Sequence, residues 1–176
     1  MKLLIILSKN LRLALCSLGM LPTLLFALDS DQNLPIKVQA DAAIVDETKG
    51  SSIYTGAVVI QQGTLELKAD EVEVLTAEGA VIQIIAKANS QSDARAHYQQ
   101  QINDSMDLVI ADAKKIIYFV QEKRLHLSGN ASLKQGTDMY RGELLYYDLG
   151  LGIVNLKSGG GVDRVNMTIS PRHSSK

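Results

Sequence analysis

Four acidic residues recur at regular positions in this sequence and are its first candidates for chemistry. Asp41 and Asp112 each follow an alanine, and Asp70 and Glu143 each lie seven residues after a glycine. A row of carboxylates could bind Ca²⁺ or cleave a glycosidic bond. Alternatively, each carboxylate could end a strand and accept hydrogen bonds from turn amides. The structural role is favoured, because one carboxylate per long repeat is too sparse for the oxygen cage that Ca²⁺ requires.

The histidines add no metal or catalytic motif to these carboxylates. His97, His126 and His173 are isolated and show none of the spacings at which two histidines hold one metal ion. The nucleophile, phosphate-loop and dinucleotide-binding motifs are missing from the sequence as well. His126 alternates with two leucines, which predicts a strand residue that faces solvent. The sequence therefore predicts a protein that is not an enzyme and has no catalytic residue, metal site or cofactor.

A glycine pattern that occurs twice indicates how the chain positions its side chains. Gly56 and Gly63 are seven residues apart in the first copy, and Gly129 and Gly136 are seven apart in the second. Asp41 and Asp112 precede the first glycine of their copies by 15 and 17 residues, and each of these intervals has room for a strand, a turn and a strand. Self-similarity at a period of tens of residues marks stacked units that bury their apolar faces against one another. The chain is therefore predicted to be a repetitive β structure.

Apolar and polar residues alternate along most of the chain with the period of a strand. The alternation is clearest from residue 64 to 75, where Leu65, Leu67 and Ala69 share one face. Roughly a dozen short strands joined by glycine turns predict an all-β antiparallel sandwich, roll or solenoid. The polar segment 87–105 is the least regular, and within it residues 94–101 fit either a short helix or a mobile loop.

The first 27 residues have the layout of a secretory signal peptide. Lys2, Lys9 and Arg12 precede an apolar run over residues 13–26, and Ala27 offers a small residue at the cleavage position. An uncleaved membrane anchor is the alternative. Cleavage after residue 27 would leave 176 − 27 = 149 residues, and because the only cysteine is Cys16, no disulfide could form. Residues 28–176 are expected to form a single domain.

The apolar content comes with little aromatic bulk. The sequence has two Phe and no Trp, and its strands are rich in Ile, Leu, Val and Ala. This composition fits an ordinary packed core, and it equally fits a sheet whose inner face accepts a long apolar ligand. Each buried methylene of such a ligand gains about 0.8 kcal/mol, so a groove of this kind could hold an acyl chain. Basic residues form no cluster with aromatic residues, so no nucleic acid partner is expected.

Two blocks of sequence share a recognisable pattern. The first block comprises residues 35–41 and 54–70 and includes Tyr54-Thr55-Gly56 and Gln62-Gly63-Thr64. The second runs from residue 127 to 136 and ends in Gln135-Gly136. Together the two blocks resemble the OstA-like family of periplasmic lipopolysaccharide-transport proteins. The resemblance covers residues 35–171 and is weakest at residues 86–91, where the sequence departs from the family pattern. It implies a twisted, slightly V-shaped antiparallel β-jellyroll that is open at both ends.

The same resemblance implies a role in lipopolysaccharide transport. Members of such a family would hold the lipid A acyl chains and bridge the inner-membrane transporter and the outer-membrane translocon. The expected partners are homologous β-rolls in those two components and further copies of the chain, joined head to tail. The expected location is the periplasm. Two alternatives remain open, which are a membrane-anchored component of the same pathway with the same fold and a carbohydrate-active or adhesive β-roll.

The alternation and the resemblance together select two sets of candidate residues. One set should face the interior and contact lipid: Ile36, Val38, Val58, Ile60, Leu65, Leu67, Leu133 and Leu144. The other set should form the edges at which copies of the chain associate: Ile36, Lys37, Val38, Val165, Met167 and Ile169. A one-residue error in register would exchange the two faces of a strand.

Overall fold

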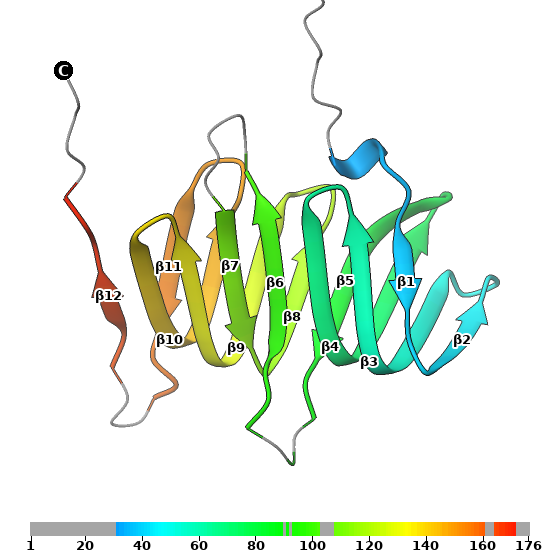
Figure 1. The fold of residues 1–176 in the computed structure, drawn as a ribbon, viewed down its shortest axis with the longest axis horizontal. Helices are drawn as coiled ribbons and strands as arrows, with labels where there is room; N and C mark the ends of the chain where they lie inside the picture. Colours follow the sequence, from blue (N-terminus) through cyan, green and yellow to red (C-terminus); the bar gives the residue numbers. More distant parts are fainter. Residues whose placement is uncertain (1–30, 90, 92, 103–107, 161–163, 172–176) are drawn as a thin grey trace, which may run out of the picture.

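In the part of the chain that the structure describes, twelve antiparallel strands form one continuous sheet that is bent into two layers (Figure 1). The computed structural model describes residues 31–89, 91, 93–102, 108–160 and 164–171, so the predicted signal peptide lies outside the described residues. A short 3₁₀ helix, η1 (Asp31–Asn33), comes first. The strands are β1 (Lys37–Gln39), β2 (Ala42–Asp46), β3 (Ser51–Gln62), β4 (Leu65–Ala77), β5 (Ala80–Lys87), β6 (Ala96–Gln101), β7 (Leu108–Ala113), β8 (Lys115–Phe119), β9 (Arg124–Gln135), β10 (Asp138–Asp148), β11 (Ile153–Lys157) and β12 (Asn166–Thr168). The predicted all-β antiparallel class is confirmed.

The four longest strands run through both layers and tie them together. The front layer has the order β1-β3-β4-β6-β7-β9-β10-β12 and uses one half of each long strand. The back layer has the order β2-β3-β4-β5-β8-β9-β10-β11 and uses the other half. In Figure 1 the bends between the layers lie along the lower edge, and the turns of both layers lie along the upper edge.

The repeated glycines are explained by these bends and turns. Gly56 and Ala57 have positive φ angles of 81° and 42°, and the register of β3 with β4 shifts at this point. Gly129 and Asn130 repeat the arrangement in β9, with φ angles of 80° and 50°. Such bulges bend a strand and increase its twist. The first glycine of each copy thus marks a bend inside one long strand.

The second glycine of each copy lies in a hairpin turn. Gly63 joins β3 to β4, and Gly136 joins β9 to β10, with φ angles of 60° and 57°. Glycine adopts this left-handed conformation without the steric penalty of a Cβ atom. The long hairpins β3–β4 and β9–β10 are therefore two copies of one unit.

The segment 94–101 is neither a helix nor a mobile loop, so both predictions for it are wrong. Residues Ala96–Gln101 form strand β6, which pairs with β4 on one side and β7 on the other. Ala96 and Tyr98 are buried and face the interior. The strand was hard to recognise because its inward positions are occupied by one small, one aromatic and one polar residue. No helix among the described residues is long and apolar enough to cross a membrane.

Candidate lipid-binding interior

The space between the two layers is filled by aliphatic side chains from the long hairpins. Five of the predicted interior residues are at most 2% exposed and belong to this core: Val58, Ile60, Leu65, Leu67 and Leu133. Ile36 and Val38 are partly buried and pack against the core at the β1 end. Full burial of one such side chain stabilises the fold by about 1.5–3 kcal/mol. The interior is thus a continuous apolar surface that the sheet wraps from both sides.

Leu144 is the one predicted interior residue that the structure places on the other face. Its neighbour Leu145 is fully buried and pairs with Leu127, whereas Leu144 is half-buried and pairs with Ser128. The cause is a register shift between Gly142 and Leu144, where β10 crosses from the front layer to the back layer. Tyr140 faces the interior, and strict alternation from it would place Leu144 on the same face. The bulge between them breaks the alternation, so Leu144 faces outward.

Three tyrosines form the part of the interior that sequence reasoning missed. The rings of Tyr98 in the front layer and Tyr118 in the back layer lie 5.6 Å apart between their centroids. The Tyr147 hydroxyl of the back layer donates a hydrogen bond of 3.1 Å to Gln135 of β9. Above all, burial raises the pKa of Tyr98 well above its usual value, so its hydroxyl stays neutral and donates to Gln100. Strand alternation could have identified Tyr118 as an inward-facing residue, because it lies two residues after the inward-facing Ile116.

Glutamine side chains line the rim where the front layer ends in turns. Gln62, Gln100 and Gln135 occupy the inward row closest to these turns, on β3, β6 and β9. The amide of Gln62 donates to the carbonyl oxygen of Leu34 at 2.9 Å. The rim is therefore polar and hydrogen-bonded, while the rows below it are apolar.

Residues 31–35, which we call the N-terminal strap, cross this rim at the β3–β4 turn. Asp31 accepts hydrogen bonds from the Thr64 amide at 3.0 Å, from the Thr64 hydroxyl and from the Gln100 amide at 3.0 Å. The carboxylate fits because Gly63 has no side chain, since a Cβ atom there would lie 2.0 Å from Asp31 Oδ1. One aspartate thus fastens the strap to both β6 and the β3–β4 turn.

Attachment of the strap is expected to depend on pH. Partial burial raises the pKa of Asp31, but the hydrogen bonds from Thr64 and Gln100 outweigh it and leave that pKa below its usual value of 3.8. Because the folded-state pKa is depressed, the stabilisation is present above pH 3.8 and is lost as the pH falls through the folded-state pKa. We expect the Thr64 amide resonance to titrate below pH 3.8 in the parent protein and to be flat in Asp31→Asn. A titration that persists unchanged in the variant would contradict this assignment.

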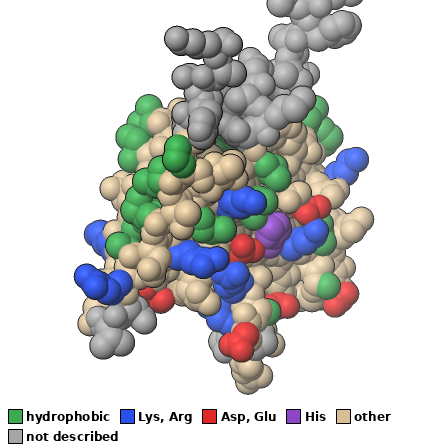
Figure 2. Space-filling model, turned by 60° about the vertical axis from the view of Figure 1, so that its left-hand side comes forward, with side chains coloured by type: hydrophobic (Ala, Val, Ile, Leu, Met, Phe, Trp, Pro, Cys, Tyr) green, Lys and Arg blue, Asp and Glu red, His purple; other side chains and the backbone are tan. Residues whose placement is uncertain are grey.

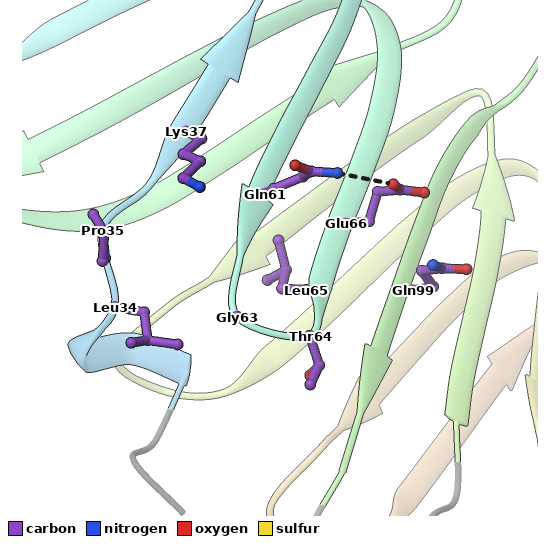
Figure 3. A pocket seen from close by; sticks show the side chains of 9 residues that line it. All are labelled: Leu34, Pro35, Lys37, Gln61, Gly63, Thr64, Leu65, Glu66 and Gln99. Atoms are coloured by element: carbon purple, nitrogen blue, oxygen red, sulfur yellow. Dashed lines mark hydrogen bonds between the residues drawn. The ribbon is translucent and has the colours of Figure 1, made fainter.

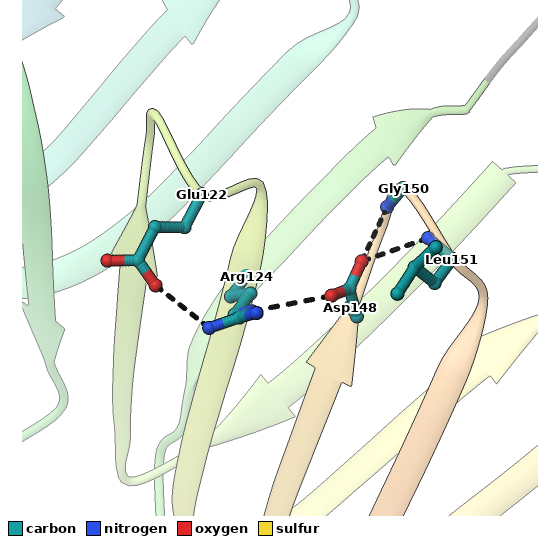
Figure 4. A network of polar contacts seen from close by, with 5 residues as sticks. All are labelled: Glu122, Arg124, Asp148, Gly150 and Leu151. Atoms are coloured by element: carbon teal, nitrogen blue, oxygen red, sulfur yellow. Dashed lines mark hydrogen bonds and ion pairs between the residues drawn. The ribbon is translucent and has the colours of Figure 1, made fainter.

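The back layer has a polar cluster at its own turns, β8–β9 and β10–β11 (Figure 4). Arg124 lies between two carboxylates, with Nη1 3.1 Å from Glu122 Oε2 and Nε 3.3 Å from Asp148 Oδ2. Asp148 also accepts hydrogen bonds from the amides of Gly150 and Leu151, which lower its pKa. These contacts fix the β10–β11 turn beside the β8–β9 turn.

Two of the four recurring carboxylates accept hydrogen bonds from backbone amides, which is the structural role that the sequence favoured. Asp70 accepts a hydrogen bond of 2.6 Å from the Asn89 amide, and Glu143 accepts one of 3.1 Å from the Asn130 amide at the β9 bend. Asp41 lies against Gly56 at the β3 bend. The residue that faces Gly129 in the second copy is Lys114, so Asp112 is not the counterpart of Asp41.

Asp112 instead pairs with His97 on the outer surface of the front layer. The distance from His97 Nδ1 to Asp112 Oδ1 is 2.8 Å, and this contact raises the pKa of His97 and lowers that of Asp112. His126 also faces outward, as predicted, and its ring lies 4.7 Å from both Phe119 and Tyr146. The described residues include no group of three or more His, Cys, Asp or Glu side chains that could hold a metal ion.

The two ends of the bent sheet expose apolar side chains. At one end, Ile44 and Val45 of β2 are 70% and 59% exposed. At the other end, Ile153 of β11, Met167 of β12 and Ile169 beyond it are 50%, 53% and 65% exposed. Figure 2 turns the β12 end toward the viewer and shows hydrophobic side chains gathered there beside Lys and Arg side chains. Exposed apolar side chains at the ends of a sheet make these ends candidates for contact with another chain.

The fold and its interior together define a class of protein, namely an antiparallel β-jellyroll with an aliphatic interior and open ends. A family model described as "LptA/(LptD N-terminal domain) LPS transport protein" matches residues 37–152. The chain therefore belongs to this family of lipopolysaccharide transport proteins, as the two glycine blocks indicated.

Individual relatives agree with the family match. The lipopolysaccharide export system protein LptH of Pseudomonas aeruginosa is 31% identical over 152 residues, which cover 83% of this chain and 85% of LptH. The protein LptA of Haemophilus influenzae is 28% identical over 151 residues, with 83% of each chain covered. The crystal structure of the Pseudomonas aeruginosa LptH, a periplasmic component of the lipopolysaccharide transport device, superposes with a TM-score of 0.71 at 30% identity over 81% of this chain and 99% of that one.

Proposed function

We propose that this protein carries lipopolysaccharide across the periplasm as part of a protein bridge from the inner-membrane transporter to the outer-membrane translocon. The observation that carries the proposal is the aliphatic interior, which runs between two layers from one open end to the other. Family membership supports the same function. The acyl chains of lipid A would replace contacts that the interior side chains now make with one another, and each methylene transferred from water gains about 0.8 kcal/mol.

The lipid-contacting residues proposed here are the inward-facing ones of the front and back layers. They are Ile36, Val38, Val58, Ile60, Leu65, Leu67 and Leu133, with Leu145 in place of Leu144. The proposed location and domain organisation follow from export: residues 1–27 serve as the signal peptide, and residues 28–176 form one periplasmic domain. N-terminal sequencing of the purified protein tests the cleavage.

Photo-crosslinking at adjacent isoleucines is the test of lipid binding. Ile84 and Ile116 are at most 1% exposed and face the interior, whereas Ile85 and Ile117 lie on the outer face of the same strands. A photoreactive residue at 84 or 116 is expected to capture lipopolysaccharide, and one at 85 or 117 is not. The pairs control for strand, residue type and distance from the ends. Equal capture from both faces would overturn the assignment of the interior.

We propose further that copies of the chain associate head to tail through their edge strands. Each layer contains eight strands in strictly antiparallel order, so β1 runs opposite to β12 and β2 runs opposite to β11. Translating one copy beside the next therefore brings β12 against β1 and β11 against β2 in antiparallel directions. Unpaired edges of this kind template sheet extension. The proposed edge residues are Ile36, Lys37, Val38, Val165, Met167 and Ile169, and homologous rolls in the two membrane components could dock in the same way.

A further inference from the structure

A pocket of about 510 Å³ lies on the outer side of the front layer, beneath the N-terminal strap (Figure 3). Leu34 and Pro35 of the strap form one wall, and the β3–β4 turn with Gly63 and Thr64 forms the end. The volume is within the range of about 300–1,000 Å³ that is typical of small-molecule sites. Leu65, which is 2% exposed and belongs to the apolar interior, also borders the pocket. The pocket is therefore next to the interior at the rim.

Four polar side chains form the floor in a row across four neighbouring strands. The register pairs Lys37 of β1 with Gln61 of β3, Gln61 with Glu66 of β4, and Glu66 with Gln99 of β6. Paired residues on one face of a sheet have Cβ atoms about 4.5–5.5 Å apart, so the row is held by the backbone itself. Gln61 donates to Glu66 at 3.3 Å, as Figure 3 shows, and Lys68 lies 2.6 Å from the same carboxylate.

The donors and acceptors of this row suit a phosphorylated sugar. The ammonium group of Lys37 makes no ion pair with a described residue and has three N–H donors for phosphate oxygens. The side-chain amides of Gln61 and Gln99 can each donate and accept, which matches sugar hydroxyls. Lys68 balances the charge of Glu66, so Lys37 leaves the floor with a net positive charge. No lining residue is aromatic, which is unlike the stacking platforms that neutral sugars use.

The wall of the pocket is held in place before any ligand arrives. The Leu34 carbonyl oxygen is bound by Gln62, and Asp31 fastens the start of the strap to Thr64 and Gln100. A site whose walls are already ordered loses less conformational entropy when a ligand binds.

We infer that the pocket binds the phosphorylated sugar headgroup of a lipid whose acyl chains enter the interior beside Leu65. The inference rests on the proposed function, because a headgroup site at the rim requires that the interior hold the acyl chains of the same lipid. Lys37 contacts the phosphate, while Gln61, Gln99 and Glu66 contact ring hydroxyls. The headgroup thereby stays in water at the rim, while the acyl chains are shielded between the layers.

The test uses glucosamine 1-phosphate, glucosamine and inorganic phosphate as separate probes against ¹⁵N-labelled protein. Glucosamine 1-phosphate is expected to shift the amide and side-chain resonances of Gln61, Glu66 and Gln99. Glucosamine and inorganic phosphate are each expected to bind about tenfold more weakly. Glucosamine lacks the phosphate that Lys37 would contact, and inorganic phosphate lacks the ring hydroxyls that Gln61, Gln99 and Glu66 would contact. Shifts from phosphate alone at equal affinity would show a simple anion site and overturn the inference.

Matched variants locate the binding. Lys37→Gln is expected to weaken glucosamine 1-phosphate about tenfold, and Lys134→Gln, which removes the same charge from an exposed position on β9 of the same face, should change nothing. Gln99→Met should also weaken the binding of glucosamine 1-phosphate, whereas Gln83→Met on the back layer should leave this binding unchanged. Equal loss in a variant and its control would overturn the site. Failure of the sugar probe with continued lipid capture at residue 84 rejects the pocket alone, and absence of lipid capture rejects the proposed function.

Discussion

Removing residues 165–176 is expected to turn a protein that forms concentration-dependent oligomers into a monomer. The deletion takes away β12, which pairs with β10 through Met139, Tyr140 and Arg141. The new edge of the front layer is then β10, which runs in the same direction as β1. An incoming β1 could pair with it only in parallel, against the antiparallel order of the sheet. Sedimentation velocity across a wide range of concentrations measures the change.

The control for this deletion is a shorter truncation that removes residues 172–176 and keeps β12. It should sediment like the parent protein at every concentration. Both truncations should still capture lipopolysaccharide through a photoreactive residue at 84, because the interior between β3 and β10 is intact. If the long truncation sediments like an oligomeric parent, the end-strand model is wrong.

Gly56→Ala is expected to destabilise the fold by about 3 kcal/mol or more. The residue has φ +81°, a conformation that costs an L-residue about 1–2 kcal/mol. In addition, the new Cβ atom would lie 2.1 Å from Asp41 Oδ2 and 2.7 Å from Asp41 Cβ. The second contact involves an atom that no side-chain rotation can move, so the backbone of one segment has to shift. Urea denaturation of the variant and the parent protein gives the difference.

Gly79→Ala is the matched control for the crowding at Gly56. Gly79 lies in the β4–β5 turn with φ +79°, and no atom lies within 4 Å of the Cβ position. Its substitution should therefore lower the free energy of unfolding only by the cost of a positive φ angle in an L-residue, about 1–2 kcal/mol. Adding Asp41→Gly to Gly56→Ala should recover the part that is due to crowding. Equal effects of the two alanine substitutions would show that Asp41 does not restrict the bend.

The parts of the structure that the sequence predicted well are those with a local physical signature. Gly63 and Gly136 do lie in turns, as the repeated glycines indicated, because glycine adopts their left-handed conformation without a steric penalty. Alternation assigned most inward residues correctly, since the period of a strand is two. Leu65 and Leu67 are examples, and both are buried.

The parts that could not be predicted depend on contacts between segments far apart in the sequence. Leu144 was assigned to the wrong face because the register of β10 with β9 shifts between Gly142 and Leu144, and the sequence of β10 alone does not show this shift. The Tyr98–Tyr118 contact joins opposite layers. The strap is held by Asp31 and Thr64, which are 33 residues apart. The local sequence pattern does not predict contacts between such distant segments.

The spacing of the repeated glycines has a consequence for the dimensions of the molecule. The first glycine of each copy sets the bend and the second sets the turn, so their spacing of seven residues fixes the height of the front wall at about 23 Å, given about 3.3 Å per residue. The number of hairpins placed side by side fixes the length of the wall instead. Height and length are therefore encoded separately, the first by a spacing within one hairpin and the second by copy number. A channel made of such units can be lengthened by adding hairpins or whole copies of the chain while its cross-section stays constant.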